Sequence, residues 1–474
     1  LGQIMTQQLV DLSHRTIAFV TQPSSTFSAP LCMGYEQCLY QNRIPHDPNL
    51  ILPPDSSFPE LVASGVSAFA CVTPQSAQHV INVLSAVGYT VPNDVSVIAL
   101  ADDVPTPSQR ISQQAVPFET YGRTLVEDLI AQCEDQKAVP KPERPALSLN
   151  SSVTLDRAFH ARKKHVIVLG NINADITLNV TSLPQIGSSV VSHNMSVNLG
   201  GKGANQAMGV AKLGWTACLI AKVGNDADAT MALQELNGGG VNTSGIRRDL
   251  AHTTGKVYIH VQEDGESMLT LVPGANQAVT PEYIRSMAPM FQNAGYCLLN
   301  PGPPTDCVLQ AAKLSKKYQA KTIFKPSARE KISAELYQLI DILVPNRHAA
   351  AALAPFSSVE EQAVYFLQQG VKNVIITLGH RGCYLRNAEQ AIWYDAPPVS
   401  VVDTTGAADA FISALAVYLL DGHELPDAVE IASHAAGFCV TKQGVIPALV
   451  DHDSLEQYLG THHKQLRCSP SLTL

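Results

Sequence analysis

Short apolar runs alternate with stretches of helical spacing along most of the chain. In the first third, strands are expected at Thr16–Val20, Ala68–Val72 and Val95–Leu100, with helices around Met33–Gln41 and Ala77–Val87 between them. Strands and helices that alternate in this way favour a parallel sheet with crossover helices. The first third is therefore expected to form an α/β domain.

The same alternation resumes on a larger scale after residue 165. Strands are expected at Val166–Gly170, Thr216–Val223, Tyr296–Asn300, Ala320–Phe324, Ile340–Val344 and Val374–Leu378, and helices at Ala204–Leu213, Thr305–Tyr318, Val359–Gln369 and Ala407–Leu420. One stretch differs, because Gly255–Gln262 and Ser267–Val272 flank an Asp-Gly turn, which is typical of a hairpin. A small antiparallel element should therefore project from the main sheet.

A charged, proline-rich segment separates the two parts of the chain. Residues Glu134–Pro145 suit a surface connection, and a basic run at Arg162–Lys164 precedes the next buried strand. We therefore predict domains at residues 1–158 and 166–460, a linker at 159–165 and a tail at 461–474.

Composition excludes several classes of protein. The chain has 474 residues, which is too long for one ordinary domain, and its 45% hydrophobic and 15% charged residues are typical of a globular protein. A net charge of -9 argues against a surface that coats nucleic acid. No apolar run reaches the roughly 20 residues of a membrane span, so no membrane association is expected. Ten cysteines without C-x-x-C pairs are typical of a reducing compartment, and we expect a cytoplasmic location.

A run of small residues from Asp403 to Phe411 leads directly into an apolar helix. A helix N-terminus without bulky side chains offers free backbone N–H groups and the positive end of the helix dipole to an anion. Asp409 lies on this turn, where a bound phosphate would repel its carboxylate. A base that acts beside a phosphoryl group is one reason to keep a carboxylate there. The pattern therefore predicts a site that transfers phosphate.

Two further polar patterns precede this run. Gly200–Gln206 places three glycines around Lys202 before a helix, which permits close backbone approach beside a positive charge. Taken alone, it fits an ordinary glycine-rich helix start equally well. Asn171–Asp175 follows the first strand of the second part, and open α/β sheets bind ligands at the carboxyl ends of their strands. By itself this pattern could equally cap a turn.

From Val166 to about Leu459 the chain resembles the ribokinase-type carbohydrate kinase family. Six motifs in the family's order carry the resemblance: Gly170–Asp175, Gly200–Ala207, Gly224–Asp226, Pro273–Asn276, Thr377–Gly382 and Asp403–Phe411. The resemblance implies a doubly wound α/β sheet with a small β lid, supplied by the Lys256–Val272 hairpin and a strand at Val190–Val197. It also implies ATP-dependent phosphorylation of D-ribose at the 5-hydroxyl to ribose 5-phosphate. The acceptor could also be another furanose or a nucleoside.

The resemblance also implies roles for single residues. Asp409 would take the proton from the attacking hydroxyl as a general base. The backbone N–H groups of Gly406, Ala407 and Ala408 would stabilise the developing negative charge. The sugar hydroxyls would be held by Asn173, Asp175, Gly201, Lys202 and Asn205. The nucleotide, with Mg²⁺, would lie near Asn346, Lys325, Thr377, Gly379 and Gly382. A potassium ion would be held by Asp403, the Thr405 carbonyl and the Gly444 region.

Four positions depart from the family's pattern. Ala408 replaces a glycine before the base, Ala349 replaces the glutamate of an Asn-x-x-Glu motif, Lys325 replaces an asparagine, and Gly302 replaces a glutamate that contacts the sugar. Each loss would remove about 1–3 kcal/mol of transition-state stabilisation. Lys325 could act as an additional phosphate-binding cation, or it could be misplaced. We expect an active kinase of reduced rate, and the alternative is a weakened or inactive sugar-responsive regulatory protein.

Residues 1–158 resemble part of the effector-binding domain of the lactose-repressor family, which has a periplasmic-binding-protein-like α/β fold. The match is strongest at Val91–Leu100. The sugar-binding positions of that family fall at Leu31, Thr73-Pro74 and near Ala101, so a folded remnant or dimerisation module without a ligand is favoured over an effector site. The DNA-binding head would precede Leu1, and nucleic-acid binding is not expected. The lid hairpin, with its alternating apolar residues, predicts a homodimer.

Overall fold

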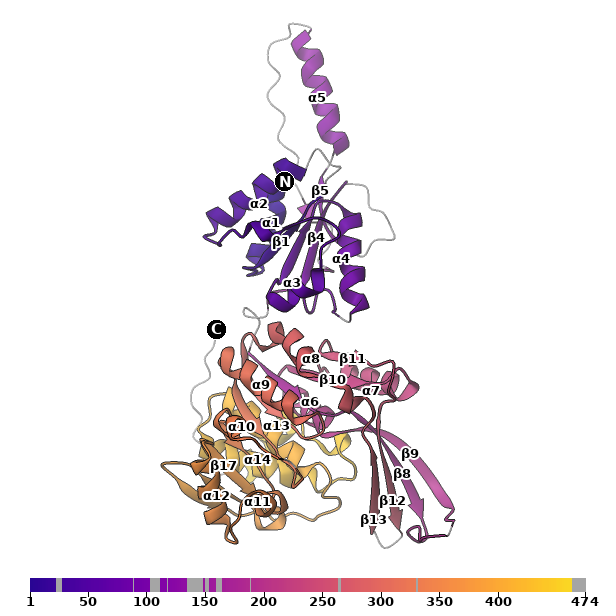
Figure 1. Ribbon diagram of the computed structural model, residues 1–474, viewed down its shortest axis with the longest axis vertical. Helices are drawn as coiled ribbons and strands as arrows, with labels where there is room; N and C mark the ends of the chain where they lie inside the picture. Colours follow the sequence, from indigo (N-terminus) through magenta and orange to yellow (C-terminus); the bar gives the residue numbers. More distant parts are fainter. Residues whose placement is uncertain are drawn as a thin grey trace. The chain divides into compact units, whose positions relative to one another are not determined.

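The computed structural model describes residues 1–22, 28–87, 89–102, 111–116, 118–133, 148–149, 153–158, 164–187, 189–262, 266–329 and 331–462. The chain forms two compact units, Leu1–Arg162 and Lys163–Leu474, and each is considered by itself (Figure 1). Most of the predicted linker at 159–165 and most of the predicted tail at 461–474 lie outside the described residues.

The N-terminal unit is built on a six-stranded sheet with the order β2-β1-β3-β4-β5-β6. Its strands are β1 (Ile17–Val20), β2 (Ile51–Leu52), β3 (Ala68–Cys71), β4 (Ser96–Asp102), β5 (Ser112–Val116) and β6 (Ser148–Leu149). All neighbouring strands are parallel except β5 and β6. The helices are α1 (Gly2–Asp11), α2 (Ser28–Gln41), α3 (Phe58–Ser64), α4 (Pro74–Ala86) and α5 (Phe118–Cys133). The three predicted strands correspond to β1, β3 and β4, and the two predicted helices to α2 and α4.

Burial within the N-terminal unit follows from this topology. Every residue of β1 and β3 is buried, because crossover helices pack on a parallel sheet. Helix α5 differs from the other helices, since Leu125, Val126, Leu129 and Ile130 are each more than half exposed.

The C-terminal unit has a nine-stranded main sheet with the order β11-β10-β7-β14-β15-β16-β17-β18-β19. These strands are β7 (His165–Leu169), β10 (Ala217–Val223), β11 (Ile246–Arg248), β14 (Ala294–Leu299), β15 (Lys321–Phe324), β16 (Ile342–Leu343), β17 (Asn373–Thr377), β18 (Cys383–Arg386) and β19 (Ala391–Tyr394). The first seven strands in the order are parallel, and β18 and β19 are antiparallel additions. The six predicted strands of this part are all present.

Helices connect the parallel strands of the C-terminal unit. They are α6 (Lys202–Lys212), α7 (Ala227–Gly238), α8 (Pro281–Ser286), α9 (Thr305–Lys317), α10 (Ala334–Gln338), α11 (Arg347–Leu353), α12 (Val359–Gln368), α13 (Ala407–Leu420), α14 (Leu425–Cys439) and α15 (His452–His462). The chain moves from β7 to β10 on one side and later to β14 on the other, so the strand order reverses at β7. The carboxyl end of β7 is therefore the expected ligand position of a doubly wound sheet.

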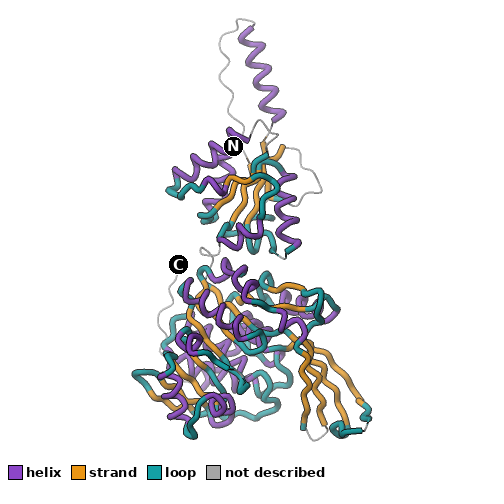
Figure 2. Tube along the Cα trace, viewed as in Figure 1, coloured by secondary structure: helices purple, strands orange, loops and turns teal. Residues whose placement is uncertain are grey.

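A separate four-stranded sheet projects from the main sheet as the lid (Figures 1 and 2). Its order is β13-β12-β8-β9, with β8 (Asn173–Val180), β9 (Ser192–Gly200), β12 (Gly255–Gln262) and β13 (Ser267–Val272). The predicted hairpin is β12–β13, and the predicted lid strand is β9. Strand β8 was not predicted: Asn173 and Asp175 lie on this strand and not in a turn.

The core of the C-terminal unit lies where α6, α13 and α14 pack against the main sheet. Helix α13 is buried along most of its length, which explains its nearly uniform apolar sequence. Within the described ranges, no helix combines the length and the apolar character that a membrane crossing needs.

Candidate active site

The glycine-rich motif brings the start of α6 against the carboxyl end of β7. A Cβ atom on Gly170 would lie 2.6 Å from the Cα atom of Gly203, so both positions depend on the absence of a side chain. Gly201 precedes the helix with a φ of 95°, which favours glycine. The Oδ1 atom of Asn171 accepts a hydrogen bond of 3.0 Å from the Lys202 N–H. These contacts place Lys202 at the reversal point of the sheet.

Asp409 lies in the first turn of α13 and is anchored by two side chains of α6. Its Oδ2 atom accepts a hydrogen bond of 3.1 Å from Asn205 Nδ2, and its Oδ1 atom accepts one of 3.0 Å from Gln206 Nε2. Gln206 also exchanges two hydrogen bonds of 2.7 Å with Asn300, directly after β14. The residue is only 6% exposed. The proposed base is therefore held rigidly between α6 and the end of β14.

The residues predicted to hold a sugar lie on β8 and at the start of α6, and one of them reaches the carboxylate of Asp409. Asn205 contacts Asp409 directly, and the Oδ1 atom of Asn173 accepts a hydrogen bond of 2.9 Å from Asn276 Nδ2. A Cβ atom on Gly200 would overlap the carboxyl group of Asp175, so this glycine leaves room for it.

Two acceptor atoms in this region have no partner among the described residues. They are the buried Oδ1 atoms of Asp175 and Asn205. Burial raises the pKa of Asp175 to about 6, although the positive charge of Lys202 acts in the opposite direction. Buried acceptors normally have a donor, so these two atoms indicate a ligand that carries hydroxyl or amide groups.

The turn before α13 presents backbone N–H groups near Asp409. Gly406 has a φ of 83°, and a Cβ atom there would lie 2.5 Å from Cγ1 of Val445. Within the described part of the chain, the N–H groups of Gly406 and Ala408 have no hydrogen-bond acceptor. Ala408 is helical with an ordinary negative φ, so its methyl group causes no backbone strain. This geometry can bind an anion at the helix N-terminus.

The three residues of the predicted potassium site come together beside this turn. Asp403 accepts hydrogen bonds from the N–H groups of Thr405 at 2.9 Å and Gly444 at 3.1 Å. Burial acts to raise the pKa of Asp403, but hydrogen bonds from Thr405 and Gly444 outweigh it and hold the pKa below its ordinary value. No cluster of three His, Cys, Asp or Glu side chains suited to a metal occurs in the described ranges. A cation here would therefore depend on one carboxylate and on carbonyl oxygens.

The residues predicted for the nucleotide lie along the ends of β15, β16 and β17. Asn346 forms an isolated β-bridge with Thr377. Its Oδ1 atom caps α11 by accepting a hydrogen bond of 2.8 Å from the N–H of Ala349. Ala349 is buried, so no carboxylate is available at that position. Gly379 and Gly382 form the turn after β17, with φ values of 64° and 82°.

The two remaining departures lie near the base and the sugar side. Lys325 follows β15 and interacts electrostatically with both Asp409 and Lys202. Gly302 has a φ of 128°, and a Cβ atom there would lie 3.0 Å from the Cβ atom of Asn171. A side chain at position 302 would need another backbone conformation, so this loop provides no replacement for the missing glutamate.

Three polar residues of the site had no role in the sequence interpretation: Gln206, Asn300 and Asn276. Gln206 and Asn276 lie within quoted motifs, and Asn300 ends a predicted strand. Their positions in the sequence therefore carried a signal, but their partners lie about 90 to 200 residues away along the chain.

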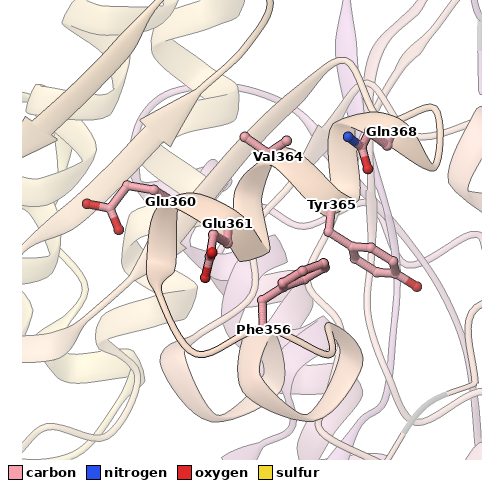
Figure 3. A pocket seen from close by; sticks show the side chains of 6 residues that line it. All are labelled: Phe356, Glu360, Glu361, Val364, Tyr365 and Gln368. Carbon is pink, nitrogen blue, oxygen red and sulfur yellow. The ribbon is translucent and has the colours of Figure 1, made fainter.

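A surface pocket of about 310 Å³ lies elsewhere, on α12 (Figure 3). It is lined by Phe356, Glu360, Glu361, Val364, Tyr365 and Gln368. Glu361 belongs to the cap of α12, because Ser358 Oγ donates to its carboxylate at 2.8 Å. With two acidic residues in its lining, this pocket does not suit a nucleotide.

The sequence matches a family model described as pfkB family carbohydrate kinase over residues 163–452. The chain belongs to this family. Residues 6–152 match a model described as a periplasmic binding protein-like domain. The C-terminal unit is therefore the sugar kinase part of the chain, and the N-terminal unit has the fold of a binding-protein-like domain.

Several ribokinases are similar to the sugar kinase unit. That of Staphylococcus aureus is 32% identical over 286 residues, which are 59% of this chain and 94% of that protein. A bifunctional ribokinase/ribose-5-phosphate isomerase A of Fructilactobacillus sanfranciscensis is 33% identical over 59% of this chain, which spans only 53% of that protein. The structure of Arabidopsis thaliana ribokinase complexed with ribose and ATP has 30% identity and a TM-score of 0.59, covering 63% of this chain and 99% of that chain.

Proposed function

We propose that the sugar kinase unit transfers the terminal phosphate of ATP to the 5-hydroxyl of D-ribose. The observation that carries this proposal is the position of Asp409 in the first turn of α13, where Asn205 donates to its carboxylate. Among the described residues, the Oδ1 atom of Asn205 and the backbone N–H groups of Gly406 and Ala408 have no partner. The similarity to ribokinases, including one whose structure holds ribose and ATP, supports the choice of acceptor and donor.

The sugar would bind between the lid and α6. Its hydroxyl groups would donate hydrogen bonds to the free Oδ1 atoms of Asp175 and Asn205, which lack donors within the described residues. Asn173 is held in place by Asn276 and would orient the sugar from β8. Every acceptor of this set lies on a regular element and not on a long loop, so the attacking hydroxyl would be held in a narrow range of positions.

Asp409 would remove the proton of the 5-hydroxyl as the oxygen attacks phosphorus. Asn205 and Gln206 fix the carboxylate by donating to its two oxygens, which leaves the remaining lone pairs for the hydroxyl. The N–H groups of Gly406 and Ala408 would stabilise charge on the transferred group. Ala408 presents this N–H without strain, so its methyl group does not exclude the role.

Mg²⁺ and K⁺ would accompany this reaction and neutralise phosphate charge or steady the anion-binding turn. Asp403, the Thr405 carbonyl and the Gly444 region fit a monovalent cation, because Asp403 keeps its carboxylate ionised beside this loop. Asn346 would lie near the phosphates, but its Oδ1 atom caps α11. Since Ala349 supplies no carboxylate, Mg²⁺ would be held chiefly by phosphate oxygens and water.

A substrate panel tests the acceptor. ADP formation from ATP would be measured with D-ribose, other furanoses and nucleosides in the presence of Mg²⁺ and K⁺. We expect the highest kcat/KM with D-ribose. A higher value with a nucleoside would identify another acceptor for the same site, and no turnover with any acceptor would support the alternative of a non-catalytic regulatory protein.

We also propose that the chain forms a homodimer through the lid and that it is located in the cytoplasm. Met195, Leu269 and Leu271 are more than half exposed on β9 and β13, which supports pairing of two lids. The nine cysteines of the described ranges are thiols that form no disulfide, which supports a reducing compartment. Analytical ultracentrifugation of the wild type and of Leu271→Glu would test the dimer, and a monomeric wild type would contradict it.

A further inference from the structure

Lys325 is brought to the candidate active site by the pairing of β14 and β15. Leu299 lies opposite Phe324 in the parallel ladder, and the Lys325 N–H donates to the Leu299 carbonyl at 3.0 Å. Lys325 therefore follows its strand beside Asn300, which is linked to Asp409 through Gln206. The backbone alone places the lysine on the same edge of the sheet as the base.

The ammonium group of Lys325 makes no direct ion pair in the described part of the structure. No ion pair or hydrogen bond joins it to a described residue, although Asp409 and Lys202 both lie within the range of electrostatic interaction. Burial lowers the pKa of Lys325, Asp409 acts to raise it, and Lys202 lowers it further. A half-buried cation without a hydrogen bond or a direct ion pair is unfavourable, so this position is suited to an anion that binds there.

Four charged groups interact in sequence at this edge, because Lys202 is near both Asp175 and Lys325, and their formal charges sum to zero. Asp175 and Lys202 interact on the lid side, and Lys325 and Asp409 interact on the side of the main sheet. We infer that Lys325 binds the terminal phosphate of ATP, with the phosphoryl group between its ammonium group and Asp409. This inference rests on the proposed function, and it assigns to the site a lysine that replaces the missing acidic motif as the phosphate contact.

Phosphoryl transfer forms one bond to phosphorus and breaks another. A lone pair of the sugar oxygen forms a bond to phosphorus, while the bond from phosphorus to the bridging oxygen of ADP breaks and its electron pair leaves with ADP. The hydroxyl proton passes to Asp409. Lys325 would stabilise the negative charge on the phosphoryl oxygens throughout this step, because its positive charge does not need to move or reorganise.

The charges favour a phosphate of the donor over an acidic group of the acceptor as the partner of Lys325. An acceptor that carried a carboxylate or phosphate would bind on the lid side next to Asp175, which would repel it. A neutral polyol meets no such repulsion. The terminal phosphate approaches from the nucleotide side, where the described residues at the ends of β16 and β17 contribute no carboxylate to the site.

Nucleotide binding tests the inference without requiring turnover. The affinities for ADP and for a non-hydrolysable ATP analogue would be measured by calorimetry for the wild type, Lys325→Met and Lys325→Arg. Lys321→Met is the matched control, because Lys321 is exposed at the opposite end of the same strand. We expect the preference of the wild type for the analogue over ADP to fall about tenfold or more in Lys325→Met. It should be largely kept in Lys325→Arg and unchanged in Lys321→Met.

Kinetic measurements on the same variants distinguish a failure of the role of Lys325 from a failure of the proposed kinase function. Lys325→Met should lower kcat about tenfold to a hundredfold while the KM for the sugar stays within about twofold. An unchanged preference for the analogue, or a loss confined to sugar affinity, would overturn the inference. If the wild type shows the preference but phosphorylates no acceptor, the proposed function fails and the role of Lys325 stands. If the wild type binds neither nucleotide, both fail.

Discussion

The two units of this chain use the polar residues at their strand ends in different ways. In the N-terminal unit, Thr21 donates to the Leu52 carbonyl at 2.9 Å, and Thr73 forms a capping box with Ser76 at the start of α4. In the sugar kinase unit, Asp175 and Asn205 each keep a buried oxygen without a partner in the described residues. The hydroxyl groups of Thr21 and Thr73 are therefore used within the N-terminal unit, whereas Asp175 and Asn205 of the sugar kinase unit each keep an acceptor available among the described residues.

This difference shows that the architecture does not by itself make a site. The family positions that would bind an effector are occupied by Leu31, which is buried, and by Thr73, whose hydroxyl is used by the backbone of Ser76. These two positions therefore carry an apolar side chain and a hydroxyl group that caps a helix. The sugar kinase unit contains both the anchored carboxylate of Asp409 and buried acceptors that lack a donor among the described residues.

Among the substitutions that test this difference between the two units, Gly406→Ala should cause the largest loss of kinase activity. A methyl group would clash with Val445 and disfavour the φ of 83°, so the N–H groups of the turn would move. We expect a loss of about a hundredfold to a thousandfold in kcat, as for the removal of an oxyanion donor. Gly422→Ala is the control, because its φ is 91° but no atom lies within 4 Å of the added Cβ. Equal kinetic effects of the two variants would contradict the role of the turn.

Gln206→Leu should lower both activity and stability. It removes the donor to Asp409 and leaves the amide of Asn300 without its partner. We expect kcat to fall by about a hundredfold through misplacement of the base, and the free energy of unfolding to fall by about 1–3 kcal/mol. Gln362→Leu also removes a buried helical glutamine, whose Nε2 atom donates to the Phe356 carbonyl. Gln362→Leu should reduce stability without lowering kcat. A similar loss of kcat in both variants would contradict the role of Gln206 in positioning Asp409.

The affinity for the sugar should depend on pH through Asp175. Its pKa is raised to about 6 from 3.8, so protonation of the free protein removes an acceptor as the pH falls through 6. We expect the KM for the sugar to rise about tenfold between pH 7 and pH 5, following the ionised fraction. Asp175→Asn should bind sugar weakly with a flat profile. A wild-type KM that does not change over this range would rule out the role of this carboxylate.

The raised pKa of Asp175 also makes folding stability depend on pH. Because the folded pKa lies above the ordinary value, the folded state binds more protons between about pH 4 and pH 6. The contribution of Asp175 therefore becomes more favourable as the pH falls through this window, and ionisation above it costs stability. Denaturant titrations of the wild type and Asp175→Asn at pH 5 and pH 7 would measure this difference.

The smallest expected effects come from the helix caps, one in each unit. Thr73→Ala and Ser358→Ala should each lower stability by about 1 kcal/mol, because each removes the acceptor of a helix N-terminal N–H. Both tryptophans, Trp215 and Trp393, lie in the sugar kinase unit. Tryptophan fluorescence should therefore detect the effect of Ser358→Ala and not that of Thr73→Ala, and kcat should be unchanged in both. An equal shift of the fluorescence midpoint would show that the units unfold together.

The alternation of apolar runs was sufficient to predict three of the six strands of the N-terminal sheet, six of the nine strands of the main sheet, the lid hairpin and the helix that starts at Ala407. Strand β8 was missed, because its partners β9 and β12 lie about 20 and 80 residues further along the chain. For the site, Asn205 was predicted on the sugar side, but its contact with Asp409 spans 204 residues. The lack of an ion pair for Lys325 among the described residues could not be predicted either, since it depends on the placement of Asp409 and Lys202, which lie on other elements.

The most direct test of the account is the rate of ADP formation from ATP and D-ribose by the wild type and by Asp409→Asn. Asp427→Asn provides the control, because Asp427 also lies in the first turn of a helix, α14. With Mg²⁺ and K⁺ present, we expect Asp409→Asn to be slower by about a thousandfold and Asp427→Asn to match the wild type. Equal rates for the wild type and Asp409→Asn would contradict the assignment of the base, and with it the proposed activity.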